Sequence, residues 1–394
     1  MRGRSVGFSL VEVMVGMVIG LLTMIVIMQS YATFEGQKRT TTNSSDVQEN
    51  GLVALHTIET DARMAGYGLL TPNGLACTTM NTSWNDPAGG ASASFHASGT
   101  AVAADNALGA VPVAPVIIAD GGAGASDTVT FTYSTVASGS NPSVLNTTMT
   151  DSDANVSVDA TNTVGFTVDQ DIFLVSTPIA SPGIGANIPC TRLAYTSGTG
   201  SANTIYNPAV GHNLFPAGGY LANQSFVLNM GTFRQNQYAV SGVASTSPAL
   251  TVQDVSIPGQ TVLPLSSNIV NIQAQYGVAA ANPSPGISSP PVTCWTDATG
   301  SACASGSGDW ANPNAADIMR IKAVRIAIVA RSSLQEQPAS GVGAAATCNA
   351  TTSAPITWTG GPAIDLSANP NWRCHRYRVY QTIIPLRNII WANI

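Results

Sequence analysis

The feature that most constrains this chain is an apolar stretch close to its N-terminus. Residues 13–34 are 22 consecutive residues without a charge. As a helix rising about 1.5 Å per residue, this stretch would span a hydrocarbon core about 30 Å thick. Arg2 and Arg4 precede it, and positive flanking residues stay on the cytoplasmic side. No small-residue cleavage site follows it, so we expect a single-pass anchor with the C-terminal part outside the cytoplasm.

Glu12 adjoins this apolar stretch, where a carboxylate is unusual. An acidic residue within lipid costs about 2.5–3.5 kcal/mol on insertion scales and usually marks a function. Residues 7–12 read Gly-Phe-Ser-Leu-Val-Glu after a basic leader. This string closely resembles the class III signal of type IV prepilins and type II secretion pseudopilins. The resemblance implies that a prepilin peptidase cuts between Gly7 and Phe8 and methylates the new amine of Phe8.

Cleavage would leave a positive amine on Phe8, four residues before Glu12. In a filament, the amine of a neighbouring subunit can neutralise Glu12 in an apolar core, where an unpaired carboxylate would be costly. We therefore expect Glu12 to fix the axial register of subunits. Gly16 and Gly20 form a G-x-x-x-G pattern. It either permits close helix packing or only softens the helix, and the pattern alone does not decide between these roles.

The composition argues against nucleic acid as a partner. Only 9% of the residues are charged, against roughly a quarter in an ordinary soluble domain. The net charge is −6, and removal of the leader would leave 13 basic and 21 acidic residues, a net charge of −8. Without a basic run, the chain is not expected to bind nucleic acid. The abundance of Gly, Pro, Ser, Thr and Asn predicts a β-rich head with long polar loops.

A helical pattern continues beyond the apolar stretch. One apolar stripe has spacings of three, four and seven residues, which is the period of a helix: Val47, Gly51, Leu55, Ile58, Ala62 and Ala65. The segment Gly66-Tyr67-Gly68, followed by Pro72, predicts the end of this helix. The stripe should pack against a sheet.

Strand patterns follow the helix. We expect strands at residues 127–133, 172–175, 269–278, 321–331 and 376–384, and a hairpin over residues 225–240. In residues 321–331, Val324, Ile326 and Ile328 share one face. In the last strand one face carries Tyr377, Val379 and Ile383, which we favour as the buried face, and the other carries Arg376, Arg378 and Tyr380. Long loops are expected at residues 85–126, 136–162, 279–317 and 335–370.

Three segments sharpen the resemblance. Residues 61–68, 321–332 and 376–388 look like the PilW family of minor pilins, which is related to the J-type minor pseudopilin of type II secretion. The resemblance implies an α+β type IV pilin fold, in which a long N-terminal helix packs on an antiparallel sheet head. It divides the chain into a leader (1–7), a transmembrane and assembly half-helix (8–34), an amphipathic half-helix (35–66) and a head (67–394).

The same resemblance implies a function. A PilW-like minor pilin would help to start pilus assembly with other minor pilins and the major pilin, near the fibre tip and with a large tip adhesin as a further partner. It would sit in the inner membrane with its head in the periplasm, and then in a surface pilus serving twitching motility and adhesion. The alternatives are a J-like pseudopilin of type II secretion and a tip adhesin that binds a surface through its loops.

Six cysteines are present, at positions 77, 190, 294, 303, 348 and 374. In an oxidising compartment an even number predicts disulfides, although six cysteines allow 15 connectivities. Cys294 and Cys303 would close a short loop, and Cys348 and Cys374 a longer one. Cys77 and Cys190 would then pair by elimination.

The sequence carries little sign of catalysis. Four histidines are scattered, and neither HExxH, G-x-S-x-G nor a P-loop occurs, so we expect no enzyme and no cofactor. The one metal-like string is Asp151, Asp153, Asn155 and Asp159, which either binds calcium or forms an Asp/Asn-rich turn; Val156 replaces the turn glycine of a calcium loop. Four tryptophans of the last third either pack beneath loops or bind a partner: Trp295, Trp310, Trp358 and Trp372.

Overall fold

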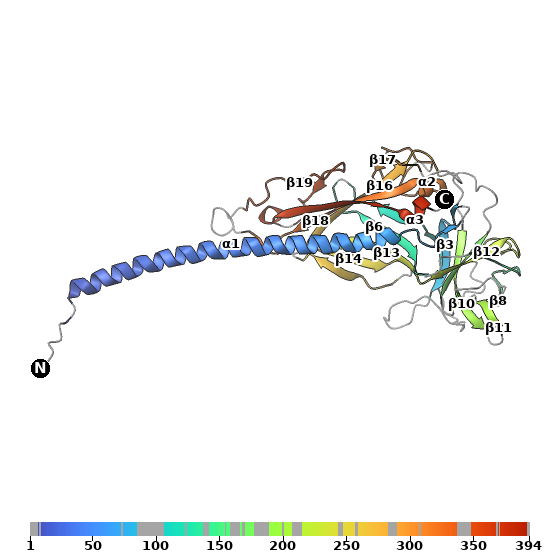
Figure 1. Ribbon diagram of the computed structural model, residues 1–394, viewed down its shortest axis with the longest axis horizontal. Coiled ribbons are helices and arrows are strands. Elements are labelled where there is room, and N and C mark those ends of the chain that lie inside the picture. The colour runs from blue at the N-terminus through green and yellow to red at the C-terminus, as the bar shows by residue number, and fades with distance from the viewer. Residues whose placement is uncertain are drawn as a thin grey trace.

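The computed structural model describes residues 7, 9–71, 74–84, 106–122, 124–136, 142–153, 155–157, 166–167, 170–176, 189–198, 201–206, 215–242, 247–256, 259–282, 290–306, 309–336, 348–367, 369 and 371–391. One long helix leads into a head built almost entirely from antiparallel strands, so the α+β class is confirmed. The first half of the helix stands free of the head, and its second half lies against it (Figure 1).

Helix α1 (Leu10–Met64) joins both helical patterns into one continuous helix of 55 residues. The predicted stripe is confirmed, because five of its six positions are buried and Leu55 is half-buried. The helix ends where the sequence predicts. Gly66 and Gly68 follow it with φ angles of 81° and 79°, a backbone region that glycine enters without steric cost. The chain can therefore reverse tightly into the head.

An eight-stranded sheet lies at the end of the head farthest from the N-terminus (Figure 1). Its neighbouring strands, in order, are β4 (Asn106–Pro112), β3 (Thr79–Trp84), β10 (Pro189–Gly198), β9 (Asp171–Ser176), β12 (Ser225–Gly231) and β7 (Ser143–Val144). Strand β11 (Ser201–Tyr206) extends from β10 and also pairs with β8 (Asn155–Ser157). Only β3 and β10 run parallel to each other; the other pairs in this sheet are antiparallel.

Two further sheets flank the second half of α1. The five-stranded sheet has the order β15 (Leu263–Ser267), β14 (Ala249–Asp254), β13 (Phe233–Ser241), β6 (Thr128–Ser134) and β5 (Val116–Ala119). The four-stranded sheet has the order β17 (Val292–Thr296), β16 (Ile269–Ala279), β18 (Ile321–Arg331) and β21 (Tyr377–Pro385). Both are antiparallel throughout.

The remaining elements are short. They are the strand pairs β1 (Leu70–Thr71) with β2 (Gly74–Leu75) and β19 (Pro355–Ile356) with β20 (Ile364–Asp365), the helices α2 (Ala315–Arg320) and α3 (Arg387–Trp391), and the 3₁₀ turn η3 (Trp372–Cys374). The expected antiparallel head is therefore present but larger than predicted, because the described chain forms three main sheets. The loops predicted at 85–126, 136–162, 279–317 and 335–370 contain β4, β5, β7, β8, β17, α2, β19 and β20, whose short runs carry no clear period.

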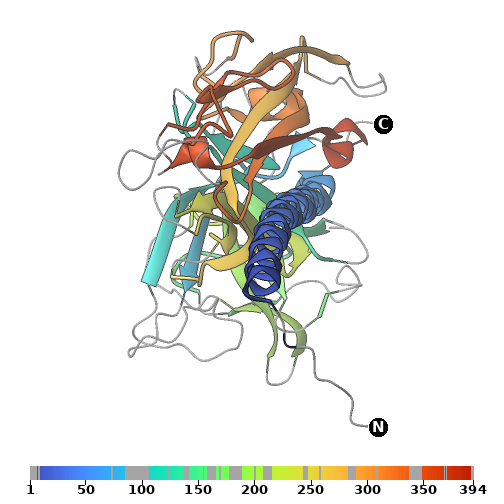
Figure 2. The same cartoon turned by 90° about the vertical axis from the view of Figure 1, so that its left-hand side faces the viewer.

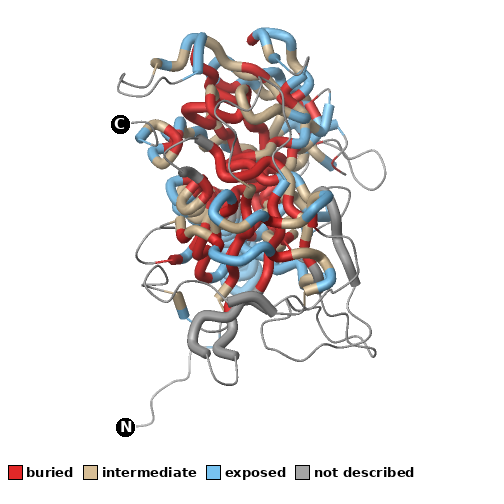
Figure 3. The backbone as a smooth tube through the Cα atoms, turned by 90° about the vertical axis from the view of Figure 1, so that its right-hand side faces the viewer, coloured by how far each residue is buried: buried red, intermediate tan, exposed pale blue. Residues whose placement is uncertain are grey.

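The main core joins the helix to both flanking sheets. The α1 stripe packs with Phe131 and Tyr238 of the five-stranded sheet and with Tyr276 and Ile326 of the four-stranded sheet. Looking along the helix from its N-terminal side, the red and orange strands of the four-stranded sheet lie to one side of it (Figure 2). Buried residues run through the middle of the head (Figure 3). The eight-stranded sheet has two separate apolar clusters of its own.

The hairpin predicted over residues 225–240 is wrong. Strand β12 pairs with β7 and β9, whereas β13 pairs with β6 and β14. The chain leaves one sheet and enters the other at Gly231, which has a φ of 58°. A Cβ at Gly231 would lie 2.8 Å from the backbone nitrogen of Val136. The apolar pattern of residues 225–240 is thus divided between two cores.

The face assignment of the last strand is also wrong. Tyr380 and Ile384 of β21 pack into the main core beside α1, while Ile383 is 57% exposed. Tyr377 and Val379 lie only partly buried over a smaller cluster on the other side of the sheet. The physical reason is that both faces of the neighbouring strand β18 are covered. One face of β21 therefore packs on the main core through Tyr380 and Ile384, and the other packs on the smaller cluster through Tyr377 and Val379.

Asp127 joins the two flanking sheets. Its Oδ1 accepts a hydrogen bond from the Gly121 nitrogen (3.0 Å) and its Oδ2 one from the Ala274 nitrogen of β16 (2.8 Å). Burial raises the pKa of Asp127 to about 7, and the carboxylates of Asp120 and Asp297 add to this effect, although the two N–H donors oppose it. The folded protein therefore binds this proton more tightly than the unfolded chain does.

This shift predicts that the protein loses stability as the pH rises. Between about pH 4 and pH 7 the folded state holds a proton on Asp127 that the unfolded chain has released, so the free energy of unfolding should fall across this window. At about 1.4 kcal/mol per pKa unit, the limit is about 4 kcal/mol. Asp127→Asn should flatten this slope in urea titrations between pH 4 and 7.5. Asp153→Asn, at a carboxyl whose pKa is lowered, is the control and should leave the slope unchanged.

Candidate assembly interface

The N-terminal part of α1 exposes an apolar surface with no counterpart elsewhere in the described chain. The stretch Leu10–Glu35 has the length and composition of a membrane anchor or signal, and none of its most apolar window is buried. Leu10, Met17 and Ile27 are between 64% and 76% exposed. A surface of this size is unfavourable in water. It therefore needs either lipid or other helices around it.

Glu12 lies at the N-terminal end of this surface. Ser9 caps the helix: its Oγ accepts from the nitrogen of Val11 (3.3 Å), and Glu12 Oε2 accepts from the nitrogen of Ser9 (3.1 Å). This is a capping box. The sequence carries the Ser-x-x-Glu pattern of a capping box, which the interpretation of these residues as a prepilin signal did not use. In the single chain, Glu12 thus stabilises the first turn of α1.

The other predicted residues of this segment lie around the helix start. Gly7 precedes α1 and is exposed, and Phe8 lies outside the described residues. Gly16 and Gly20 are one helical turn apart, and a Cβ added at either position would meet nothing within 4 Å. Their face of the helix is therefore open for a neighbour. The processing site and the roles of Glu12, Gly16 and Gly20 stay predictions.

A carboxylate network fixes the far end of α1 to the head. Asp61 accepts hydrogen bonds from the hydroxyl of Tyr133 (3.1 Å), the hydroxyl of Tyr238 (2.7 Å) and the amide of Asn236 (2.7 Å). Tyr133 belongs to β6, and the other two residues belong to β13. Burial, with the Asp61 carboxylate as a second cause, raises the pKa of both phenols, so both remain donors. The sequence gives no sign of this network, since Asp61 looks like a solvated residue beside the stripe.

The C-terminal segment contacts α1 along its second half. The hydroxyl of Tyr380 donates to the backbone oxygen of Val47 (3.3 Å), and its ring occupies the place where a side chain at Gly51 would stand. The amide of Asn388 donates to the backbone oxygens of Met64 (3.2 Å) and Ala65 (3.0 Å), which have no partner within the helix. The head thus holds α1 from its middle to its last turn.

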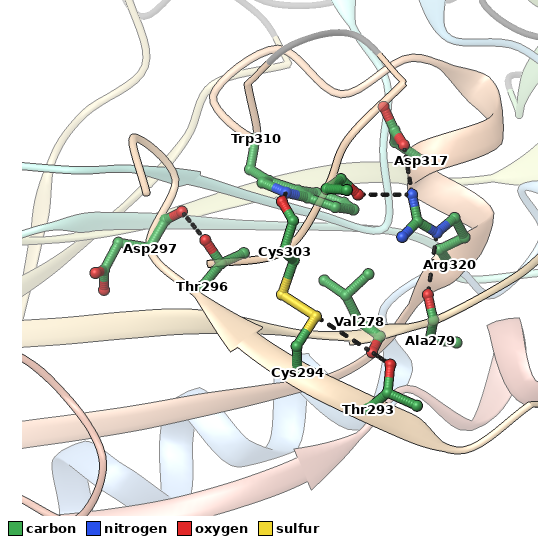
Figure 4. The surroundings of a disulfide bond; sticks show 11 residues. Val278, Ala279, Thr293, Cys294, Thr296, Asp297, Cys303, Trp310, Asp317 and Arg320 are labelled. Carbon is green, nitrogen blue, oxygen red and sulfur yellow. Dashed lines mark hydrogen bonds and ion pairs between the residues drawn. A yellow bond between two sulfur atoms is a disulfide. The ribbon is translucent and has the colours of Figure 1, made fainter. Parts of the chain in front are cut away.

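Three disulfides brace the head. The structure joins Cys77 to Cys190, Cys294 to Cys303 and Cys348 to Cys374, which are the pairs expected from the sequence. The Cys294–Cys303 bridge closes over the buried Trp310, whose Nε1 donates to the backbone oxygen of Cys303 at 2.9 Å (Figure 4). Beside it, Arg320 forms an ion pair of 3.1 Å with the buried Asp317 (Figure 4).

The four tryptophans singled out in the sequence serve mainly as packing groups, whereas Trp391 is 61% exposed. Trp310 and Trp358 are buried, and Trp295 and Trp372 are half-buried. The guanidinium of Arg325 lies between two of them, 4.8 Å from the ring centre of Trp295 and 5.2 Å from that of Trp358. Contacts of this kind are attractive. They tie the loops of two disulfides together across the outer face of the four-stranded sheet.

The calcium hypothesis receives no support from the part of the chain that can be described. Asp153 accepts from the nitrogen and the hydroxyl of Thr150 (2.6 and 2.7 Å) and so closes a turn. The side chain of Asn155 and all of Asp159 lie outside the described residues. Among the described residues, no three His, Cys, Asp or Glu side chains form a group that could hold a metal ion.

Comparison with known proteins gives one match. A family model described as Type IV Pilus-assembly protein W matches residues 237–388. This range includes the whole four-stranded sheet and most of β13, and it leaves out α1 and the eight-stranded sheet. Neither a curated protein nor a solved structure matches the chain. The head segment is therefore similar to the PilW family, and together with the exposed N-terminal apolar helix it supports a PilW-like component of the type IV pilus.

Proposed function

We propose that the protein is a minor pilin that helps to start assembly of a type IV pilus together with other minor pilins. It has a structural rather than a catalytic role, with the major pilin as its later neighbour in the fibre near the tip. One observation carries this proposal: a single helix has one half wholly exposed and apolar, and its other half is fixed to the head by Asp61, Tyr380 and Asn388.

This construction suits a subunit that changes surroundings. In the membrane the exposed half of α1 is covered by lipid, and in a fibre it is covered by the helices of other subunits. The contacts of the distal half stay within the chain in both settings. The head can therefore follow the helix as a rigid unit when the subunit is extracted. A pilin fold accounts for these features, with the eight-stranded sheet as an additional part of the head.

A second candidate is a tip adhesin. The eight-stranded sheet favours it, because this sheet lies at the end of the head away from the N-terminus and outside the residues matched to the family (Figure 1). Binding of the purified protein to abiotic and host surfaces would support this role. A J-like pseudopilin remains the nearest structural alternative, and it would copurify with components of a secretion channel instead of other minor pilins.

Processing provides the first test of the proposal. Mass spectrometry of protein from the membrane should find a mature N-terminus at Phe8 carrying a methyl group. Gly7→Val should block cutting, because the peptidase requires a small residue before the bond, whereas Gly3→Val in the leader should be processed normally. Recovery of an intact Met1 from the unmodified chain would contradict the prepilin assignment.

Glu12 provides the second test. Glu12→Val should insert into the membrane at least as well as the unmodified chain, because it removes a charge that costs about 2.5–3.5 kcal/mol in lipid. Its incorporation into sheared fibres should fall at least tenfold, on the order of 1.4 kcal/mol or more of lost pairing. Immunoblots of membrane and fibre fractions measure both quantities.

A conservative variant separates the two roles of Glu12. Glutamine also forms a capping box but carries no charge, so Glu12→Gln should keep the first helical turn and still fail to enter fibres. Glu12→Val/Val13→Glu restores a carboxylate about 100° around the helix and should not rescue incorporation. Normal incorporation of Glu12→Gln would show that Glu12 acts only as a cap.

A further inference from the structure

The end of the head nearest the apolar half of α1 has an unusual set of side chains. We call it the basal surface and define it by Leu334, Trp372, Arg373 and Arg376. Its position is set by contacts with the helix, because the amide of Asn43 donates to the backbone oxygen of Leu334 (3.4 Å). In Figure 1, this end of β18 points along α1 toward the N-terminus, and Figure 2 views the same end directly.

The helix keeps the basal surface close to the end of the apolar stretch. That stretch ends at Glu35, and α1 continues without a break. Asn43 follows eight residues later, which is about 12 Å of helical rise. The headgroup layer of a bilayer is about 5–7 Å deep on each side. The space left between the basal surface and the headgroups is therefore within about one Debye length at physiological salt.

The chemistry of the basal surface is basic and aromatic. Arg373 is exposed and forms no ion pair with a described residue; its guanidinium lies 5.0 Å from the ring centre of the half-buried Trp372. The side chain of Arg376 is 58% exposed, and Leu334 is 46% exposed. Arginine, tryptophan and an exposed leucine are the residues that settle at a membrane–water interface.

The nearby carboxylates already have partners within the protein. Glu336 pairs with Arg376 at 2.9 Å, and Asp46 accepts from the hydroxyl of Ser333 at 2.9 Å. From residue 35 to residue 46 the helix sequence carries two acidic residues, Glu35 and Asp46, and two basic ones, Lys38 and Arg39, so its formal charges balance. Within the basal surface as defined, Arg373 is therefore the charged side chain that forms no ion pair with a described carboxylate.

The basal surface is also held in a fixed shape. The Cys348–Cys374 disulfide ends the turn that carries Trp372 and Arg373. Next to it, the buried His375 places Nδ1 2.9 Å from the backbone oxygen of Ser332, whose nitrogen donates to the backbone oxygen of Arg376 (2.8 Å). Little conformational freedom would be lost when this surface binds.

We propose that the basal surface docks on the headgroups of anionic phospholipids while the subunit is still in the membrane. This inference rests on the proposed membrane anchor. Arginine forms paired hydrogen bonds with phosphate, and the anchor makes docking intramolecular, so that few contacts are needed. Docking would hold the head against the membrane until extraction replaces the lipid contacts with those of other subunits.

The test uses the full chain reconstituted into vesicles of phosphatidylcholine with or without 30% phosphatidylglycerol. A lipid carrying a spin label on its headgroup quenches tryptophans that lie close to the surface. The signal is the difference in tryptophan quenching between the unmodified chain and Trp372→Phe. This difference isolates Trp372 from the other five tryptophans. We expect this signal in anionic vesicles, and little of it in neutral vesicles or in 1 M NaCl, where the Debye length is about 3 Å.

Variants assign the effect to the two arginines. Each basic residue near an anionic surface changes the ratio of docked to free heads about fivefold, so Arg373→Gln/Arg376→Gln should lower that ratio about 25-fold. Arg234→Gln/Arg387→Gln removes the same charge near the far end of α1, where Asn388 meets the helix end, and should keep the signal. Both double variants leave Trp372 in place.

Flotation of the vesicles separates the two levels of the hypothesis. A chain that does not float with vesicles overturns the membrane anchor and the docking together. A chain that floats, but whose Trp372 is quenched equally in neutral and anionic vesicles, overturns the docking alone. The docking is also overturned if Arg373→Gln/Arg376→Gln quenches like the unmodified chain.

Discussion

Replacing Asp171 with alanine is expected to lower the free energy of unfolding by about 3–5 kcal/mol, because it leaves a buried arginine without its counterion. Asp171 on β9 and Arg192 on β10 form a paired contact of 3.2 and 2.9 Å, and their side chains are only 6% and 3% exposed. Asp171 also accepts from the nitrogen of Phe233 (2.7 Å), at the start of β13. The carboxylate therefore joins the eight-stranded sheet to the five-stranded sheet.

Two matched variants identify the cause of this loss. Glu336→Ala breaks an ion pair whose Arg376 side chain is 58% exposed, and such pairs contribute about 0–1 kcal/mol. Asp171→Leu/Arg192→Met removes both buried charges and should recover part of the stability lost in Asp171→Ala. Urea titrations of the full chain in detergent, followed by near-ultraviolet circular dichroism, measure all three. A loss below 1 kcal/mol for Asp171→Ala would contradict a buried, uncompensated charge.

Removing residues 376–394 should unfold the head. The deletion takes away β21, which pairs with β18 along nine residues and carries Tyr380 and Ile384 into the main core. It also exposes the edge of β18 and removes Asn388 from the end of α1. We expect loss of the cooperative thermal transition and aggregation in place of a monomer. A truncated protein that stays monomeric with an unchanged melting temperature would contradict this role of β21.

Two neighbouring isoleucines test the same strand without a deletion. Ile384 is 1% exposed and Ile383 is 57% exposed. Ile384→Ala should cost about 2–5 kcal/mol, the usual range for a buried isoleucine, and Ile383→Ala should stay within about 0.5 kcal/mol. The reverse order would mean that the face favoured from the sequence is the buried one.

The features from which we predicted a function are local in the sequence. The prepilin-like signal around Glu12, the apolar stretch and the stripe from Val47 to Ala65 all lie within one helix, and the structure has that helix and buries that stripe. The end of the helix followed from Gly66 and Gly68. Loop lengths led to the disulfide pairs that the structure contains.

The pairing of strands was beyond local patterns. The alternation of apolar and polar residues along 225–240 is the same whether two strands pair with each other or belong to different sheets. Strands β12 and β13 belong to different sheets. The buried face of β21 depended on β18 being covered on both sides. Short strands such as β5 carried too few residues to show a period.

The sequence by itself determined that this protein has a long helix with one free apolar half and one half bound to a β-rich head. It did so because helix period, helix length and chain breaks are encoded in neighbouring residues. Only the tertiary structure decided that Asp61 binds Tyr133, Asn236 and Tyr238, that Asp171 meets Arg192 and Phe233, and that Leu334 meets Asn43 of α1. These contacts join residues that are far apart in the chain, and their energy depends on burial that folding creates.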